Sequence, residues 1–295
     1  MNVVIEGRRR SLGSFEVERV LPHPLHRMVG PFIFFDHLGP VTLPRGLTRD
    51  ADVRPHPHIG LATVTYLFEG EIMHRDSTAI EQAIRPHEVN WMTAGRGITH
   101  SERFERARRE GGPIHALQAW VALPDEAEET EPVFAHHEGA DLPQQRSEGV
   151  TLRVLAGEAF GLRAKVHTLS PLFYVHASVA RGAAVPMAAG YAEHGVYLVS
   201  GVLEGEGHRI EPGQMLLSGA QQPLLRAQAD SVVMLLGGDP VGPRFIEWNF
   251  VASSQERIEQ AKADWRAGRM KLPDADNREF IPLPADPVPG ANALS

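Results

Sequence analysis

Two short motifs place histidine and glutamate side chains at a spacing that suits metal binding. One residue separates His56 from His58, and one residue separates His100 from Glu102. Alternate residues of an extended strand point to the same side, so each pair would direct two ligand groups at one point. Imidazole and carboxylate suit a divalent first-row metal, and the chain has no cysteine that could offer a thiolate. On neighbouring strands, the two pairs predict a centre with three imidazoles, one carboxylate and open positions for further ligands.

These motifs lie among short segments that are typical of β-strands. Residues 63–68, 89–93 and 116–123 are rich in β-branched, aromatic and aliphatic side chains, and glycine or proline follows each segment closely. The whole chain contains 28 glycines and 23 prolines. Short apolar segments separated by such turns predict an all-β barrel or sandwich.

The second half of the chain repeats the order of strand, glycine turn and proline-led turn. Residues 195–201 resemble 65–70, and residues 211–217 resemble 85–91. An acidic, proline-bearing stretch lies between the two halves and suggests a linker. We therefore expect an N-terminal metal-binding barrel, a linker, a second barrel without metal ligands, and a helix with an extended tail, over residues 1–130, 131–148, 149–250 and 251–295.

The second half does not repeat the ligand motifs. Met187 and Ala189 stand where the first histidine pair would be, and Arg226 and Gln228 stand opposite the second pair. We therefore predict one metal per chain. Near the C-terminus, Ser253 and Glu256 have the spacing of a helix capping box, so a short helix should begin there.

A further motif, His74-Arg75-Asp76, allows two interpretations. Asp76 could lie just outside the metal centre and orient either a ligand histidine or Arg75, as carboxylates around metal sites do. Alternatively, Arg75 and Asp76 could form an ion pair that steadies a turn. The pattern alone favours the ion pair.

Several longer motifs resemble the pirin family of the cupin superfamily. They are GPFIFFDHLGP at 30–40, HPH at 56–58, TVTYL at 63–67, HRDS at 74–77 and NWMTAGRGITHSE at 90–102. The resemblance implies a bicupin, which is a pair of antiparallel, jelly-roll-type β-barrels. It also implies one metal, usually iron, held by the residues that match His56, His58, His100 and Glu102.

The resemblance leaves two kinds of function open. Some bacterial pirins cleave the flavonol quercetin with dioxygen and release carbon monoxide, which implies a quercetin 2,3-dioxygenase-like enzyme acting on a flavonol or similar enol. Glu102, the one carboxylate of the predicted ligand set, would then be catalytic and take the substrate proton. Mammalian pirin is instead an iron-dependent redox sensor and transcriptional co-regulator, which implies a non-enzymatic protein with a protein partner. The resemblance favours Fe(II), whereas the ligand types by themselves also suit Ni, Mn, Zn or Cu.

Composition limits the remaining classes. The 295 residues are 42% hydrophobic and 22% charged, as in soluble globular proteins. The formal charge of −8 argues against direct binding of nucleic acid. No apolar run reaches the roughly 18 residues of a membrane span, and the first residues lack the apolar core of a secretory signal. We therefore expect a cytoplasmic protein with no membrane partner.

Overall fold

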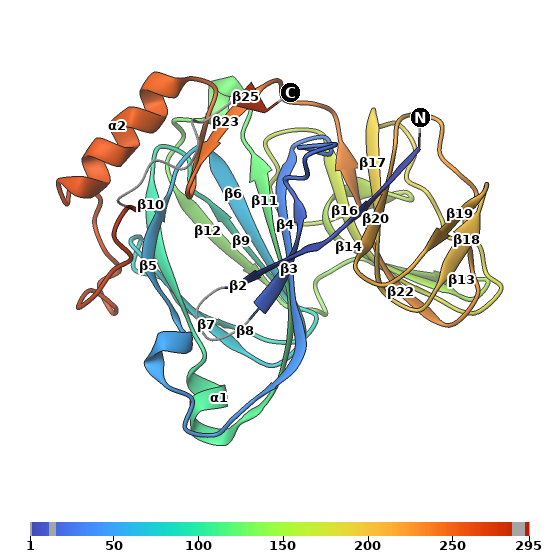
Figure 1. The fold of residues 1–295 in the computed structure, drawn as a ribbon, viewed down its shortest axis with the longest axis horizontal. Helices are drawn as coiled ribbons and strands as arrows, with labels where there is room; N and C mark the ends of the chain where they lie inside the picture. The colour runs from blue at the N-terminus through green and yellow to red at the C-terminus, as the bar shows by residue number, and fades with distance from the viewer. Residues whose placement is uncertain (1, 12–15, 285–292, 295) are drawn as a thin grey trace. The chain divides into compact units, whose positions relative to one another are not determined.

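The computed structural model describes residues 2–11, 16–284 and 293–294. Within these residues the chain is built mainly from antiparallel β-strands, with two α-helices, α1 (Glu105–Glu110) and α2 (Gln255–Arg266). Short 3-10 turns occur at Arg49–Ala51 and Asp125–Ala127. The predicted all-β class is therefore confirmed (Figure 1).

Two compact units divide the described chain. One contains residues 18–36 and 137–241 together with the N-terminal strand β1, and the other contains residues 37–136 and the described residues from 242 onward. The sequence pattern groups residues 1–130 in one continuous segment. In the structure, Val3 and Val4 of β1 instead pair with Leu217 and Leu216 of β20, so the start of the chain completes a sheet of the second half.

The first of these units contains an antiparallel sheet over an aliphatic core. Val154, Val175, Val196 and Leu216 are among its buried members. In the order of pairing, its strands are β1 (Val3–Glu6), β20 (Gln214–Ser218), β17 (Glu193–Ser200), β22 (Ser231–Gly238), β16 (Leu172–Val179), β14 (Val150–Ala159) and β13 (Gln144–Ser147), with β15 (Leu162–Arg163) beside β14. A smaller sheet contains β19 (His208–Ile210), β18 (Leu203–Gly205) and β21 (Arg226–Ala227).

The predicted ligand residues lie in the other unit, in a four-stranded sheet. Its strands, in the order of pairing, are β5 (Val53–His58), β10 (Ile98–Arg103), β7 (Ile72–Asp76) and β8 (Glu81–Ile84). A longer sheet contains β12 (Val133–His137), β9 (Val89–Thr93), β6 (Leu61–Glu69), β11 (Gly112–Ala122), β4 (Phe32–Leu43), β3 (Glu16–Leu21) and β2 (Arg8–Ser11). A third contains β24 (Phe250–Ala252), β23 (Arg244–Glu247) and β25 (Ala293–Leu294). The strands predicted over 63–68 and 89–93 fall within β6 and β9, and the strand predicted over 116–123 overlaps β11, which ends one residue earlier.

The C-terminal helix starts one residue later than the capping motif predicts. Ser254, rather than Ser253, is the N-cap, and its hydroxyl accepts a hydrogen bond from the Arg257 amide. Ser253 instead donates to Glu128 at 2.8 Å, a partner distant in the sequence. One face of α2, with Ile258, Ala261 and Trp265, packs on Phe250 as expected from its spacing.

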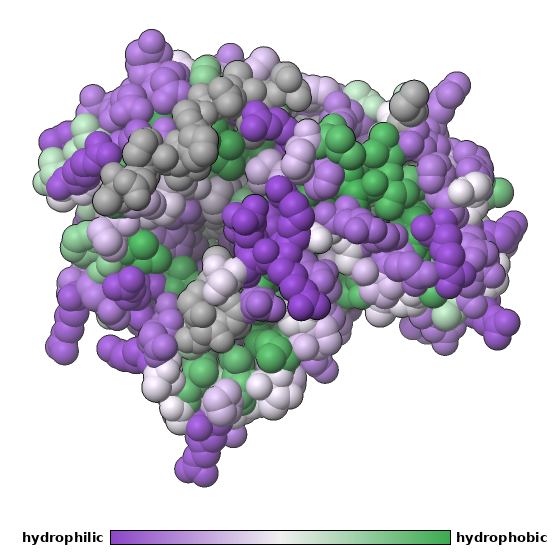
Figure 2. All heavy atoms as spheres, viewed as in Figure 1, coloured by the Kyte–Doolittle hydropathy of each residue, from purple (hydrophilic) through white to green (hydrophobic). Residues whose placement is uncertain are grey.

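Polar side chains cover most of the face shown in Figure 2, with smaller apolar areas between them. Phe280 is one of the large apolar residues that remain exposed. Among the described residues, no helix is long and apolar enough to cross a membrane.

Candidate metal centre

Three predicted ligands come together on the strands β5 and β10. The antiparallel register places His100 opposite His56, and Ile98 opposite His58. The three histidines are buried, and one ring nitrogen of each lies within 4.8 Å of the others. Their ring centroids are 4.4 to 5.1 Å apart. The two i, i+2 motifs therefore supply three imidazoles to one point, as the sequence predicts.

Each imidazole is oriented by a contact of its Nδ1 atom. His56 Nδ1 lies 2.9 Å from the Arg54 carbonyl, and His58 Nδ1 lies 3.1 Å from the Asn249 carbonyl. A carbonyl only accepts, so both rings donate from Nδ1 and keep a lone pair on Nε2. His100 Nε2 is buried and has no hydrogen-bond partner among the described residues. This donor set fits a divalent metal, which would take three neutral Nε2 atoms.

Burial keeps these rings in the form that binds metal. Loss of hydration lowers the pKa of His56 to about 4, and it lowers the pKa of His58 and His100 well below the usual value. Neighbouring imidazoles lower all three further, because each would repel a second positive charge. At neutral pH the cluster is therefore uncharged and need not release protons to bind a cation.

Glu102 lies near this cluster but outside its tight group. The register of β10 with β5 shifts between His100 and Glu102, because β5 has one extra residue there, so Glu102 pairs with Val53 instead of continuing the regular ladder. Its carboxylate is not among the atoms that lie within 4.8 Å of one another. Burial raises the pKa of Glu102 to about 7. The structure therefore brings together the three imidazoles and leaves the predicted fourth ligand beside them.

The neighbouring strand β7 adds a polar pair to the same face. In the register of β7 with β10, Asp76 lies opposite His100 and His74 lies opposite Glu102. His74 Nδ1 lies 3.3 Å from His100 Nδ1, and His74 Nε2 lies 3.0 Å from Asp76 Oδ2. Burial acts to raise the pKa of Asp76, but hydrogen bonds from His74 and Thr78 outweigh it and lower that pKa. The sequence alone assigns no separate role to His74, although the His-x-Asp spacing is a signal for such a pair.

Arg75 points to the other face of the sheet. It donates to Glu81 at 2.9 Å and to Glu105 at 2.8 Å. The expected ion pair between Arg75 and Asp76 is therefore wrong, because successive residues of a strand face opposite sides.

The C-terminal segment binds that other face of β10. Ser101, which lies between two predicted ligands, donates to Asp276 at 2.6 Å. Arg103 donates to both carboxylate oxygens of Asp276, at 2.7 and 2.8 Å. In addition, the Ile281 amide donates to the Pro55 carbonyl of β5 at 2.8 Å. Figure 1 shows this segment in red beside β5 and β10. The C-terminal segment therefore holds β5 and β10, the strands that carry the histidines.

Comparison with known proteins agrees with this geometry. The family model described as Pirin matches residues 14–121, and that of the Pirin C-terminal cupin domain matches residues 174–271. A pirin-like protein of Caulobacter vibrioides is 57% identical over 286 residues, which cover 96% of this chain and 99% of the relative. The chain belongs to the pirin family. Homo sapiens pirin is 31% identical over 277 residues, covering 90% of this chain and 91% of that protein.

One solved structure matches the full length of the chain. The structure of a quercetin 2,3-dioxygenase from Acinetobacter baumannii matches with a TM-score of 0.90 and 32% identity, covering 100% of this chain and 98% of that one. Together with the two family matches, this confirms the predicted bicupin architecture.

In the C-terminal cupin domain of this pirin, the residues that correspond in sequence to the predicted metal ligands have other roles. Met187 packs against the aliphatic core. Arg226 is exposed and donates to the Gly182 carbonyl at 3.2 Å. Among the residues that the structure describes, the three histidines of the first cupin form the cluster suited to a metal. One metal per chain stays a prediction.

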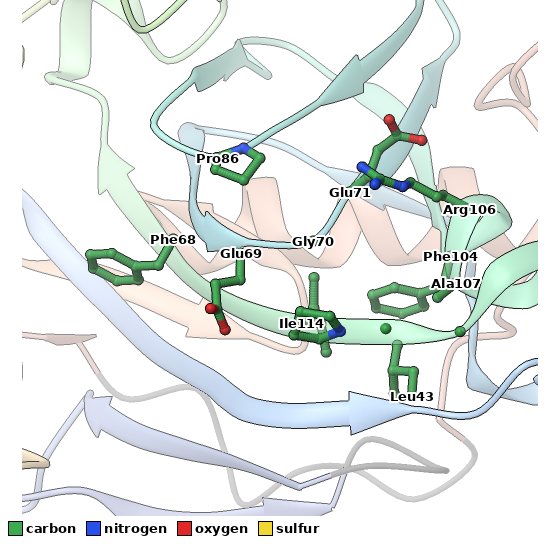
Figure 3. A pocket seen from close by; sticks show the side chains of 13 residues that line it. Leu43, Phe68, Glu69, Gly70, Glu71, Pro86, Phe104, Arg106, Ala107 and Ile114 are labelled. Carbon is green, nitrogen blue, oxygen red and sulfur yellow. The ribbon is translucent and has the colours of Figure 1, made fainter.

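A separate pocket of about 280 Å³ opens elsewhere in the N-terminal cupin of this pirin. Its wall combines the apolar Leu43, Phe104 and Ile114 with the charged Glu71 and Arg106 (Figure 3). None of the predicted ligands lines this pocket, so the metal centre is a distinct feature.

Proposed function

We propose that this pirin is a metal-dependent dioxygenase of the quercetin 2,3-dioxygenase type, with Fe(II) as its metal. The observation that carries the proposal is the cluster of three buried imidazoles whose ligand nitrogens lie within 4.8 Å of one another, with no hydrogen-bond partner for His100 Nε2 in the part of the chain that the structure describes. The full-length match to a quercetin 2,3-dioxygenase supports the reaction class. The proposed substrates are a flavonol, or a similar enol, and dioxygen.

His56, His58, His100 and Glu102 would hold the metal in this proposal. A divalent metal held there would supply Lewis acidity and redox chemistry toward dioxygen. Three neutral imidazoles and one carboxylate leave Fe(II) with one net positive charge, which favours an anionic enolate over a neutral enol. The burial of the rings excludes water and strengthens that electrostatic preference.

Glu102 is the proposed base for the substrate hydroxyl. It shares a strand with His100 and pairs with His74 of β7, the strand on which Asp76 pairs with His100, and this pairing supports a carboxylate beside the ligand cluster. Because it lies outside the tight group, it can accept a proton on one oxygen without removing an imidazole from the centre. We therefore expect Glu102 to matter more for turnover than for metal retention.

The experiment starts from protein purified without chelator or added metal, whose metal content is measured. The protein is then reconstituted anaerobically with Fe(II) and mixed with quercetin in an oxygen electrode, with carbon monoxide measured as product. We expect about one metal per chain and uptake of oxygen that depends on quercetin. His56→Ala should lose metal and activity, whereas Glu102→Gln should keep some metal and lose turnover. The exposed His167→Ala serves as the matched control.

Two results would contradict the proposal. Turnover that persists in both His56→Ala and Glu102→Gln would show that the cluster is not the active site. A redox-active metal without oxygen uptake would instead indicate the non-enzymatic redox sensor. The metal content itself decides between Fe(II) and Ni, Mn, Zn or Cu.

A further inference from the structure

A chain of hydrogen bonds connects His100 to a buried carboxylate on the neighbouring strand. It runs from His100 Nδ1 to His74 Nδ1 over 3.3 Å, and from His74 Nε2 to Asp76 Oδ2 over 3.0 Å. His74 is 5% exposed and Asp76 is 1% exposed. The His74 ring also stacks on Phe134, with 4.5 Å between the ring centroids. This chain of His100, His74 and Asp76, which we call the relay, is therefore held in place by packing as well as by hydrogen bonds.

The position of each proton in this relay follows from the carboxylate end. An ionised carboxylate only accepts, so His74 donates from Nε2. When the His74 ring carries this one proton only, its Nδ1 has a lone pair, and the 3.3 Å contact between the two Nδ1 atoms requires His100 to donate from its own Nδ1. The lone pair of His100 is consequently on Nε2, the buried atom with no hydrogen-bond partner among the described residues.

We propose that Asp76, acting through His74, sets the tautomer of His100 and so makes His100 Nε2 a metal ligand. This inference rests on the proposed metal site and adds two positioning residues to it. Carboxylates commonly orient metal-bound histidines by direct contact. Here the His74 imidazole lies between the Asp76 carboxylate and the ligand His100, so Asp76 determines which nitrogen carries the proton on both rings.

The other oxygen of Asp76 makes the proposal testable by an isosteric change. Asp76 Oδ1 accepts from the Thr78 amide at 2.8 Å, from the Thr78 hydroxyl at 2.6 Å and from the Ile80 amide at 3.3 Å. In Asp76→Asn, these donors would hold the amide oxygen, and the amide nitrogen would face His74 Nε2. That nitrogen donates, so His74 would carry its proton on Nδ1. His100 would then accept on Nδ1 and carry its own proton on Nε2, which blocks the metal position.

The first test is the dissociation constant of Zn²⁺, measured on metal-free protein by competition with a chromophoric chelator. We expect Asp76→Asn to bind Zn²⁺ about 10 to 100-fold more weakly than the unmodified protein. The matched control is Glu81→Gln, which also removes one carboxylate from this sheet but faces Arg75 on the other side. It should change the constant by less than about twofold, and equal effects of the two variants would overturn the proposal.

A double-mutant cycle separates the relay from a merely structural role. His74→Gln removes the imidazole link, so adding Asp76→Asn to it should change Zn²⁺ affinity by less than about twofold. Independent, additive losses would contradict the relay. In metal-free protein, ¹⁵N NMR of labelled histidines should show His100 protonated at Nδ1 and His74 at Nε2. The reverse order would refute the proposal even if Asp76→Asn did not fold. If the unmodified protein bound no Zn²⁺, the proposed metal site itself would be wrong.

Discussion

Replacing Asp276 with alanine should weaken the sheet that carries the histidines, although Asp276 lies on its opposite face. The Asp276 carboxylate accepts three hydrogen bonds, one from Ser101 at 2.6 Å and two from Arg103 at 2.7 and 2.8 Å. Arg103 is 3% exposed, so its charge depends on protein partners. Burial acts to raise the pKa of Asp276, but the hydrogen bonds from Arg103 and Ser101 outweigh it and lower that pKa.

The loss of unfolding free energy in Asp276→Ala depends on the partners that Arg103 keeps. Removing one partner of a buried ion pair costs about 3–5 kcal/mol. Arg103 would keep Asp52 at 3.4 Å and Glu279 at 3.0 Å, and the Asp276 side chain is 15% exposed, so water can replace part of the contact. We therefore expect a loss of about 2–3 kcal/mol in the free energy of unfolding. That corresponds to a decrease in melting temperature of roughly 4–10 °C for domains of this size.

The assay is calorimetric unfolding of the metal-free protein, with Asp274→Ala as the matched control. Asp274 lies in the same segment and pairs with Lys271 at 2.9 Å, but both side chains are 59% exposed. An exposed pair contributes about 0–1 kcal/mol, so the control should melt within about 3 °C of the unmodified protein. Equal melting temperatures for the two variants would refute the argument that this segment fixes β10. The Zn²⁺ affinity should also fall in Asp276→Ala alone, because Ser101 lies between His100 and Glu102.

Two further predictions concern pH and a buried cation. The metal-free protein should lose stability below about pH 6.5, by up to about 1.4 kcal/mol per pH unit for each group such as His56, because the unfolded chain takes up protons that the folded protein excludes. Glu102 opposes this loss, because its raised pKa lets the folded protein gain a proton as the pH falls. Glu102→Gln should therefore make the free energy of unfolding, measured with urea, decline more steeply between pH 7.5 and 5.5. Identical pH profiles of the variant and the unmodified protein would contradict this prediction. Arg244→Ala should cost about 3–5 kcal/mol, because the guanidinium is 1% exposed and pairs with Glu128. A melting temperature as high as that of the exposed-site variant Arg269→Ala would contradict this prediction.

Local patterns predicted the parts of the structure that depend on neighbouring residues. The i, i+2 rule was enough to bring His56, His58 and His100 to one point, because it needed only two paired strands. The helix position was wrong by one residue because two serines offer the same cap. The choice between Ser253 and Ser254 depends on Glu128, which is distant in the sequence.

Long-range pairing could not be predicted in the same way. Strand β1 joins β20 across more than half of the chain, and no local signal in the first residues marks that partner. The contact of the relay with His100 could not be predicted for the same reason. The His-x-Asp spacing places His74 and Asp76 on one side of a strand, but only the register of β7 with β10 brings that side to His100. Spacing gives the direction of a side chain, whereas its partner depends on which strands pair.

The position of Glu102 also depends both on spacing, which gives the direction of its side chain, and on strand pairing, which gives its neighbours. The i, i+2 rule places Glu102 on the side of β10 that carries His100, and the pairing of Glu102 with His74 agrees with that. The register shift opposite Ser101, where β5 has one extra residue, pairs Glu102 with Val53, and the Glu102 carboxylate is not among the ligand atoms that lie within 4.8 Å of one another. Because the Glu102 carboxylate lies outside the tight group of ring nitrogens, it should contribute less to holding the metal than the imidazoles do, and it stays available to accept a substrate proton. We therefore expect Glu102→Gln to lower kcat far more than it weakens Zn²⁺ binding, and equal losses in both would contradict the role of Glu102 as base.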